Sequence, residues 1–155
     1  MPIDGARFGH VNLTAHDWHR VTAFYADVFG WTSVLPERDY RGPGLDAGTG
    51  LAGAHLTGAH LRLPGHGDVG PTLEIYQYDA MAEHAGAVVN QPGFGHVAFQ
   101  VPDVPAALAA VLAAGGGRVG EVVTLQTADR RRVTWCYATD PEHNIVELQS
   151  WSELD

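Results

Sequence analysis

The sequence has very little cysteine and few basic side chains. Cys136 is the only cysteine in 155 residues, and nine basic residues stand against 18 acidic ones. A single cysteine excludes an internal disulfide, which is typical of a protein in a reducing compartment. The net charge of −9 argues against nucleic acid as a partner, because that binding needs a basic surface that releases counterions. It argues equally against an anionic membrane surface.

Long apolar segments are missing as well. The longest helix-like apolar run, from Ala106 to Ala114, is far too short to span a bilayer. The N-terminal segment MPIDGARFGH lacks the apolar stretch of a secretory signal. The hydrophobic fraction of 45% is ordinary for a globular protein. We therefore expect a cytoplasmic protein whose residues 1–155 form one small domain.

What the chain does contain is an internal repeat. The segment FGHVNL at Phe8–Leu13 returns as FGHVAF at Phe94–Phe99, 86 positions later. Each copy precedes an apolar pattern with helical spacing, with Asp17 or Asp103 at the N-cap and glycine after the end. The predicted apolar helix faces are Trp18, Val21, Phe24, Tyr25, Val28 and Phe29 in the first copy, and Val104, Ala107, Leu108, Val111 and Leu112 in the second.

Three stretches after each helix have the composition of strands, with glycine, proline and aspartate at the turns between them. They are Trp31–Pro36, Ala59–Leu63 and Thr72–Tyr78 in the first half, and Val119–Leu125, Arg132–Thr139 and Asn144–Trp151 in the second. The sequence thus predicts an α+β fold of two tandem βαβββ modules, which form a half-open barrel with the helices outside. Module 1 covers about residues 6–80, a linker 81–93 and module 2 about 94–152, and the glycine-rich stretch Arg41–Gly53 is predicted to be a flexible loop.

Histidine and glutamate recur at equivalent places in the two modules. Strand alternation puts His10 and His96 on the concave face, opposite the apolar residues expected to contact the helices, Val11 and Leu13 in the first copy and Val97 and Phe99 in the second. Glu74 and Glu147 each lie inside an apolar strand, where a carboxylate needs a partner. Two imidazoles and two carboxylates suit a divalent first-row metal ion with positions left open for substrate.

Three polar residues share the predicted concave face with this donor set: Asn12, Tyr76 and Gln149. Their positions allow them to orient a substrate, although an ordinary polar lining in contact with water explains them equally well. His143 occupies a tight turn in the segment DPEHN, at a position that glycine would favour.

The paired modules and the segments FGHVNL, AFYADVFGW, TLEIYQY, FGHVAFQVPDV and DPEHNIVELQSW resemble the vicinal oxygen chelate superfamily. That group includes glyoxalase I, methylmalonyl-CoA epimerase, extradiol dioxygenases and bleomycin resistance proteins. The resemblance covers nearly the whole chain and places His10, Glu74, His96 and Glu147 on the four metal-ligand positions. It implies one divalent ion (nickel, zinc, cobalt, manganese or iron) and a homodimer.

The resemblance favours a glyoxalase-like lyase, isomerase or epimerase that acts on vicinal oxygens through an enediolate-type intermediate. Glu147 is then the catalytic base, and Glu74 is a ligand and a second candidate base. Ala15, Val21 and Trp31 depart from the usual glyoxalase I pattern. A bleomycin-resistance-like binder without catalysis remains an alternative, although such binders usually lack the four ligands. An extradiol dioxygenase is a second and weaker alternative, because residues 128–130 hold no histidine where that chemistry needs one.

Overall fold

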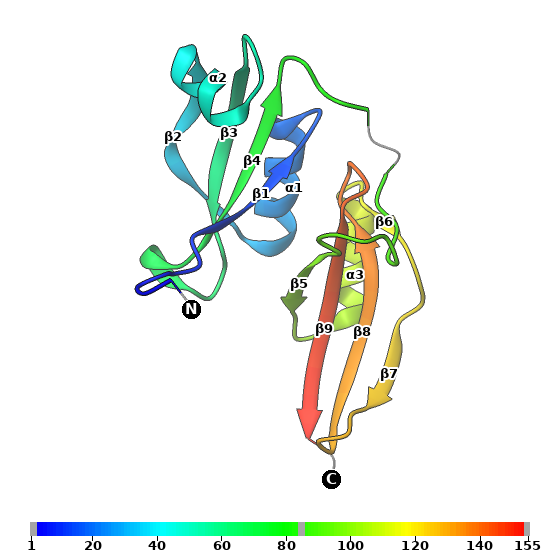
Figure 1. The fold of residues 1–155 in the computed structure, drawn as a ribbon. Coiled ribbons are helices and arrows are strands. Elements are labelled where there is room, and N and C mark those ends of the chain that lie inside the picture. Colours follow the sequence, from blue (N-terminus) through cyan, green and yellow to red (C-terminus); the bar gives the residue numbers. More distant parts are fainter. Residues whose placement is uncertain (1–2, 84–85, 154–155) are drawn as a thin grey trace. The chain divides into compact units, whose positions relative to one another are not determined.

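The computed structural model describes residues 3–83 and 86–153. The chain divides after Glu83 into two compact units, and each carries its own sheet and its own helical cover (Figure 1). The expected α+β class is confirmed, because the described residues form one sheet of four strands and one of five, together with three α-helices. No helix in the described ranges is long and apolar enough to cross a membrane.

The first unit is a four-stranded sheet in the order β1-β4-β3-β2. The outer strand β1 runs parallel to β4, and the remaining neighbours are antiparallel. Helix α1 packs on β3 and β4 (Figure 1). The elements are β1 (His10–Thr14), α1 (Trp18–Phe29), β2 (Thr32–Arg41), α2 (Pro43–Thr49), β3 (His55–Arg62), the 3-10 turn η1 (Gly67–Val69) and β4 (Thr72–Tyr78).

The second unit repeats this plan around the order β5-β9-β8-β6, with β7 paired to β8. Strand β5 runs parallel to β9, as β1 does to β4. Helix α3 packs on β8 and β9. The elements are β5 (Val97–Gln100), α3 (Val104–Ala113), β6 (Gly117–Arg118), β7 (Val123–Gln126), β8 (Arg131–Thr139) and β9 (Ile145–Glu153).

The two long helices begin where their caps predict. The Asp17 carboxylate accepts a hydrogen bond from the Arg20 amide at 3.0 Å, and Asp103 accepts one from the Ala106 amide at 2.9 Å. Gly30 ends α1 with a φ of 70°, the left-handed conformation that glycine adopts without strain. The buried faces comprise Trp18, Val21, Phe24 and Tyr25 in α1, and Val104, Leu108 and Val111 in α3.

Two apolar side chains lie outside the core that the pattern predicts. Leu112 is 38% exposed, because it lies at the edge of the α3 face that covers the sheet. Val11 is 39% exposed, because β1 is an outer strand and α1 lies over β3 and β4. The sequence pattern predicts which side chains share a face of the sheet, but it does not distinguish a central strand from an edge strand, where the same face is more exposed.

Several predicted boundaries were wrong. Strand β2 continues to Arg41 and β3 begins at His55, so both strands extend further toward the segment that connects them than expected. The strand expected at Val119–Leu125 is replaced by two short strands, β6 and β7. The stretch Arg41–Gly53, predicted to be a flexible loop, contains helix α2. Pro43 in its first turn and Gly50 after its end give the helix its start and stop.

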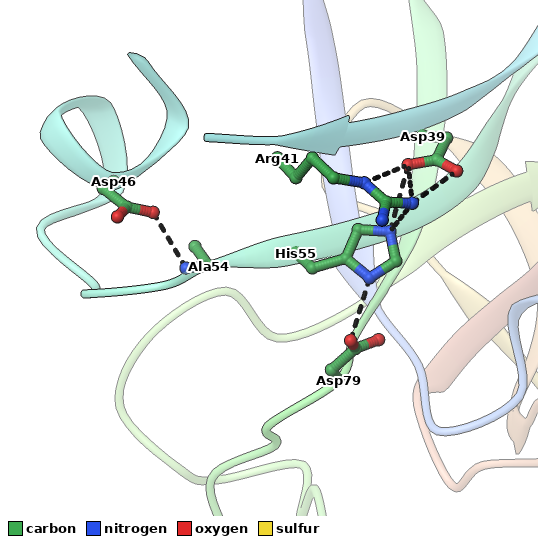
Figure 2. Close-up of polar contacts among 6 residues, drawn as sticks. All are labelled: Asp39, Arg41, Asp46, Ala54, His55 and Asp79. Atoms are coloured by element: carbon green, nitrogen blue, oxygen red, sulfur yellow. Dashed lines mark hydrogen bonds and ion pairs between the residues drawn. The ribbon is translucent and has the colours of Figure 1, made fainter. Parts of the chain in front are cut away.

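A charged network ties together the strand ends beside α2 (Figure 2). The His55 imidazole lies between two carboxylates, with Nδ1 2.8 Å from Asp79 Oδ2 and Nε2 3.0 Å from Asp39 Oδ1. Arg41 Nη2 donates to the same Asp39 oxygen at 2.9 Å and lies 3.1 Å from His55 Nε2. Asp46 of α2 accepts from the Ala54 amide at 2.8 Å, which fixes the entry of β3. The network therefore joins β2, β3 and the residue after β4.

The network shifts two pKa values in opposite directions. Hydrogen bonds to Asp79 and then Asp39 raise the pKa of His55 above its usual 6.5, although burial and the Arg41 charge oppose the change. Hydrogen bonds from Arg41 and then His55 lower the pKa of Asp39 below its usual 3.8. The stabilisation from His55 is therefore complete below its unfolded pKa and is lost as the pH rises through its folded pKa. The stabilisation from Asp39 is lost as the pH falls through its own lowered pKa.

We expect His55→Gln to lower the melting temperature more at pH 5.5 than at pH 8.5, because protonated His55 holds both carboxylates only at the lower pH. Thermal unfolding of wild type and variant at the two pH values measures this. His66→Gln, at an exposed histidine of the same unit, is the control and should shift the melting temperature equally at both. A His55→Gln effect that is larger at pH 8.5 would contradict the assignment.

Candidate functional site

The first His–Glu pair forms where β1 lies beside β4. The register sets Asn12 opposite Glu74, with His10 two residues earlier on the same face. Nε2 of His10 lies 3.3 Å from Oε2 of Glu74. The His10 side chain is half exposed, whereas that of Glu74 is 11% exposed. A carboxylate with this little access to water needs such partners.

A second imidazole reaches the same carboxylate, and sequence reasoning missed it. His60 lies opposite Glu74 in the β3–β4 register, with its Nε2 3.0 Å from Glu74 Oε1. The hydroxyl of Tyr76 lies 2.6 Å from the same His60 nitrogen. The signal for His60 was its place within a predicted strand, but only the register between β3 and β4 sets it against Glu74.

Burial shifts the pKa values of His60 and Tyr76 in opposite directions. Burial lowers the pKa of His60, while the negative charge of Glu74 opposes that change. Burial also raises the pKa of Tyr76 well above its usual value, and the Glu74 charge and a hydrogen bond to Glu74 add to the shift. Tyr76 therefore remains a neutral hydroxyl throughout the physiological range, so it can donate to the carboxylate.

The second unit forms an equivalent pair. His96, one residue before β5, places Nε2 2.8 Å from Oε2 of Glu147. Tyr137 lies opposite Glu147 in the β8–β9 register, and its ring centroid is 5.1 Å from that of His96. The side chains of His96 and Glu147 are 33% and 18% exposed. Both units thus join a histidine at their first strand to a glutamate on their last.

A tight turn sets the start of β9, and therefore the position of Glu147. The buried Asp140 carboxylate accepts hydrogen bonds from the Glu142 amide at 2.9 Å and the Asn144 amide at 3.0 Å. His143 lies between them with a φ of 69°, as the segment DPEHN predicts. A left-handed backbone is strained for a residue with a side chain. The Asp140 hydrogen bonds hold the turn in place.

The three predicted substrate residues lie near these pairs. Asn12 is the register neighbour of Glu74 and accepts a hydrogen bond from the Thr14 hydroxyl at 3.2 Å. Gln149, two residues after Glu147 on the same strand, accepts one from the Trp151 indole. Tyr76 contacts His60. Their role toward a substrate stays a prediction.

The donors in each unit are suited to a metal ion, but neither unit makes a complete site. Among the residues that the structure describes, no three or more His, Cys, Asp or Glu side chains form a group that could hold a metal. Of the four predicted ligands, each unit supplies one imidazole and one carboxylate in contact, which are nitrogen and oxygen ligands that divalent first-row ions accept. A four-ligand site requires the pair from each unit and stays a prediction.

Comparison with known proteins identifies the family. A family model described as the Glyoxalase/Bleomycin resistance protein/Dioxygenase superfamily matches residues 7–148. The chain belongs to this superfamily. The match spans both units and includes all four predicted ligands. No curated protein matches the chain.

Solved structures of this superfamily share the fold at low sequence identity. A glyoxalase family protein from Bacillus cereus is 22% identical, with a TM-score of 0.79 over 97% of this chain and 99% of that one. A superfamily domain from a Frankia species is 18% identical, with a TM-score of 0.59 over 97% and 95% of the two chains. A glyoxalase I variant from Zea mays is 20% identical, with a TM-score of 0.61 over 92% of this chain and 45% of that one.

The close approach of Tyr76 to His60 depends on Gly58, which lies opposite Tyr76 in the register. A Cβ added at Gly58 would lie 2.0 Å from the Ile75 carbonyl oxygen and 2.6 Å from the Tyr76 ring. We expect Gly58→Ala to destabilise the protein by about 1–3 kcal/mol, the usual cost of overpacking a well-packed site. Urea unfolding measures the loss, and an unchanged midpoint would contradict it.

Gly48→Ala is the matched control for this substitution. Gly48 lies within α2, and nothing lies within 4 Å of a Cβ added there. Alanine at that position is expected to leave the protein equally stable or more stable by up to about 1 kcal/mol, because alanine favours a helix interior over glycine.

Proposed function

We propose that this protein is a divalent-metal-dependent lyase, isomerase or epimerase of the glyoxalase type. The observation that carries the proposal is the repeated pair, His10 with Glu74 and His96 with Glu147, at equivalent positions in two units. Membership of the superfamily, which includes enzymes such as glyoxalase I, supports it. The substrate is a small molecule with two neighbouring oxygens.

The proposed ligands are His10, Glu74, His96 and Glu147. When bound, a divalent ion polarises the oxygens of the substrate and so acidifies a carbon next to its carbonyl group. The ion is nickel, zinc, cobalt, manganese or iron. The ligands come from both units, either of one chain or of two chains in a homodimer.

Glu147 is the proposed base. Its carboxylate takes the proton from the acidified carbon and returns it to a neighbouring position, which suits a carboxyl group held near the reacting atoms. Glu74 serves as a ligand and as a second candidate base. Asn12, Tyr76 and Gln149 orient the substrate through hydrogen bonds.

Elemental analysis of protein purified without added metal tests the metal requirement. We expect about one divalent ion for each set of four ligands, and loss of the ion on treatment with a chelator. Glu74→Gln is expected to reduce the bound metal, whereas Glu37→Gln, at an exposed position of β2, should leave it unchanged. Metal-free protein that binds no transition ion in a titration would overturn the proposal.

Turnover tests the base. With 2-oxoaldehyde–thiol adducts and acyl-CoA epimers as substrates, Glu147→Gln should retain the fold and most of the metal while lowering kcat by about 10²–10⁴-fold, the usual contribution of a general base. Exchange of the substrate proton for deuterium, followed by NMR, reads the same step directly. Glu121→Gln is the control, because Glu121 is an exposed carboxylate of the same unit. Full activity of Glu147→Gln would exclude Glu147 as the base.

Measurements on the same samples distinguish the proposed activity from the two alternatives, a binding protein and a dioxygenase. A tight complex with a small molecule, without turnover and indifferent to chelators, would favour a binding protein instead. Oxygen uptake by an iron-loaded sample with catechols would favour a dioxygenase. A cytoplasmic location is part of the proposal.

A further inference from the structure

The sheet of the second unit carries apolar side chains on the same face as Glu147. Residues opposite each other in neighbouring antiparallel strands lie on the same side of a sheet, and so do residues two positions apart along one strand. The register sets Tyr137 opposite Glu147. The next two rows on this face, read from β7 across β8 to β9, are Val123, Trp135 and Gln149, and then Leu125, Val133 and Trp151. The apolar strip, as we call it, comprises Val123, Leu125, Val133, Trp135 and Trp151.

The apolar strip reverses the usual polarity of a sheet that has a helix on one side only. The opposite face of β8 and β9 carries the buried Cys136 and Leu148, and continues with Thr134 opposite Ser150. An antiparallel sheet is normally apolar toward its helix and polar toward water. Three members of the strip are nevertheless between 36% and 51% exposed. Neighbouring exposed apolar side chains of this kind mark a binding surface.

The repeated fold does not require a large side chain in the strip. Gly58, opposite Tyr76, occupies in the first unit the position that Trp135, opposite Gln149, occupies in the second. Both units form their sheets with these two very different residues. The indole of Trp135 is therefore better explained by a role particular to the second unit than by packing.

Ring contacts connect the strip to the His96–Glu147 pair. The ring centroid of Tyr137 lies 5.1 Å from that of His96 and 5.0 Å from that of Trp135. The planes of Tyr137 and Trp135 meet at 76°, the edge-to-face arrangement that aromatic pairs prefer. A molecule bound beside Glu147 thus has an aromatic surface within reach along β8.

Contacts on both sides orient the indole of Trp151. It donates a hydrogen bond to Gln149 Oε1, and the Arg131 guanidinium lies 4.5 Å from its ring centroid. The second contact is a cation–π interaction. A side chain that is already oriented loses little conformational entropy when a ligand binds to it.

The size of the strip suits a small molecule. Four residues separate Glu147 from Trp151, which is about 13 Å of strand, and three neighbouring strands span about 10 Å. The product of these lengths is on the order of 10² Å², whereas a stable protein–protein interface needs about 800 Å² from each partner. The strip alone is therefore too small to hold a second protein or a second copy of this chain.

We propose that the substrate carries an aromatic ring, and that Trp135 and Trp151 bind this ring while the neighbouring oxygens of the substrate lie beside Glu147. The inference rests on the proposed function, because it assigns the strip to the substrate of that site. An aromatic ring gains both from apolar burial and from ring contacts with the two indoles, whereas an aliphatic group gains from burial alone. The two tryptophans are thus specificity-determining residues.

Two ligands that share neighbouring oxygens and differ by one phenyl group test the assignment: hydroxyacetone and 1-hydroxy-3-phenylacetone. Amide NMR titration of wild type should show about 10-fold tighter binding of the phenyl compound. Trp135→Ala should remove most of this preference and leave the affinity for hydroxyacetone unchanged. Trp151→Ala should also lower the preference, and it keeps the test decisive where Trp135→Ala does not fold. Thr134→Ala, on the opposite face of β8, is the control and should retain the wild-type preference.

Three results of this titration would overturn the proposal. The first is equal affinity of wild type for the two ligands, or no binding of the phenyl compound. The second is a phenyl preference that survives in folded Trp135→Ala and Trp151→Ala. The third is an equal loss of preference in Thr134→Ala, which would attribute the effect to the strand. Sedimentation adds a fourth, because a dimer that dissociates in Trp135→Ala would mean that a second copy covers the strip.

Turnover separates this proposal from the proposed function. With phenyl- and methyl-substituted 2-oxoaldehyde–thiol adducts, Trp135→Ala should raise KM for the phenyl substrate about 10-fold and leave kcat nearly unchanged, because the strip binds ground state and transition state alike. A phenyl preference that depends on Trp135, in a protein without metal-dependent turnover, would contradict the proposed function and support the strip as a binding site. Metal-dependent turnover with no phenyl preference would overturn the role of the strip and not the proposed function.

Discussion

The parallel pairing of the first and last strands of each unit is the constraint on which the candidate site depends. It brings His10 close to Glu74, which follows 64 positions later, and His96 close to Glu147, which follows 51 positions later. Parallel strands need a crossover connection, and in both units a helix followed by antiparallel strands supplies it. Apolar neighbours on β4 and β9 hold the pairing in place: Leu73, Ile75, Val146 and Leu148, all at most 2% exposed. The glutamates between them face the other side of the sheet, where the imidazoles meet them.

The sequence was sufficient to predict the features that follow from periodicity. Helical spacing and aspartate caps identified α1 and α3, and strand alternation predicted one common face for His10 and His96. Both signals are local or repeated in the chain, so they need no knowledge of the sheet order. The features that escaped prediction depend on contacts between strands. His60 is one such case, because only the β3–β4 register sets it against Glu74.

Helix α2 shows a second way in which sequence reasoning fails. Gly44 and Gly48 lie inside this short helix, and glycine costs about 1 kcal/mol relative to alanine in a helix interior, so its composition predicts a loop. The helix forms because its ends are well defined. Pro43 starts it, Gly50 ends it with a φ of 74°, and Asp46 accepts from the Gly53 amide at 2.9 Å. Stop and start signals therefore outweigh helix propensity in this segment.

The His–Glu pairs are better explained by chemistry than by stability. An ion pair that includes a poorly exposed carboxylate gains little, because the cost of removing that charge from water offsets the attraction, and apolar residues often stabilise the same position equally well. The strands β4 and β9 are otherwise rich in buried aliphatic side chains, so a leucine at position 74 or 147 would suit the sheet. Two units nevertheless place the same pair of groups at the same strands. A shared requirement for an imidazole next to a carboxylate accounts for this repetition, whereas packing does not.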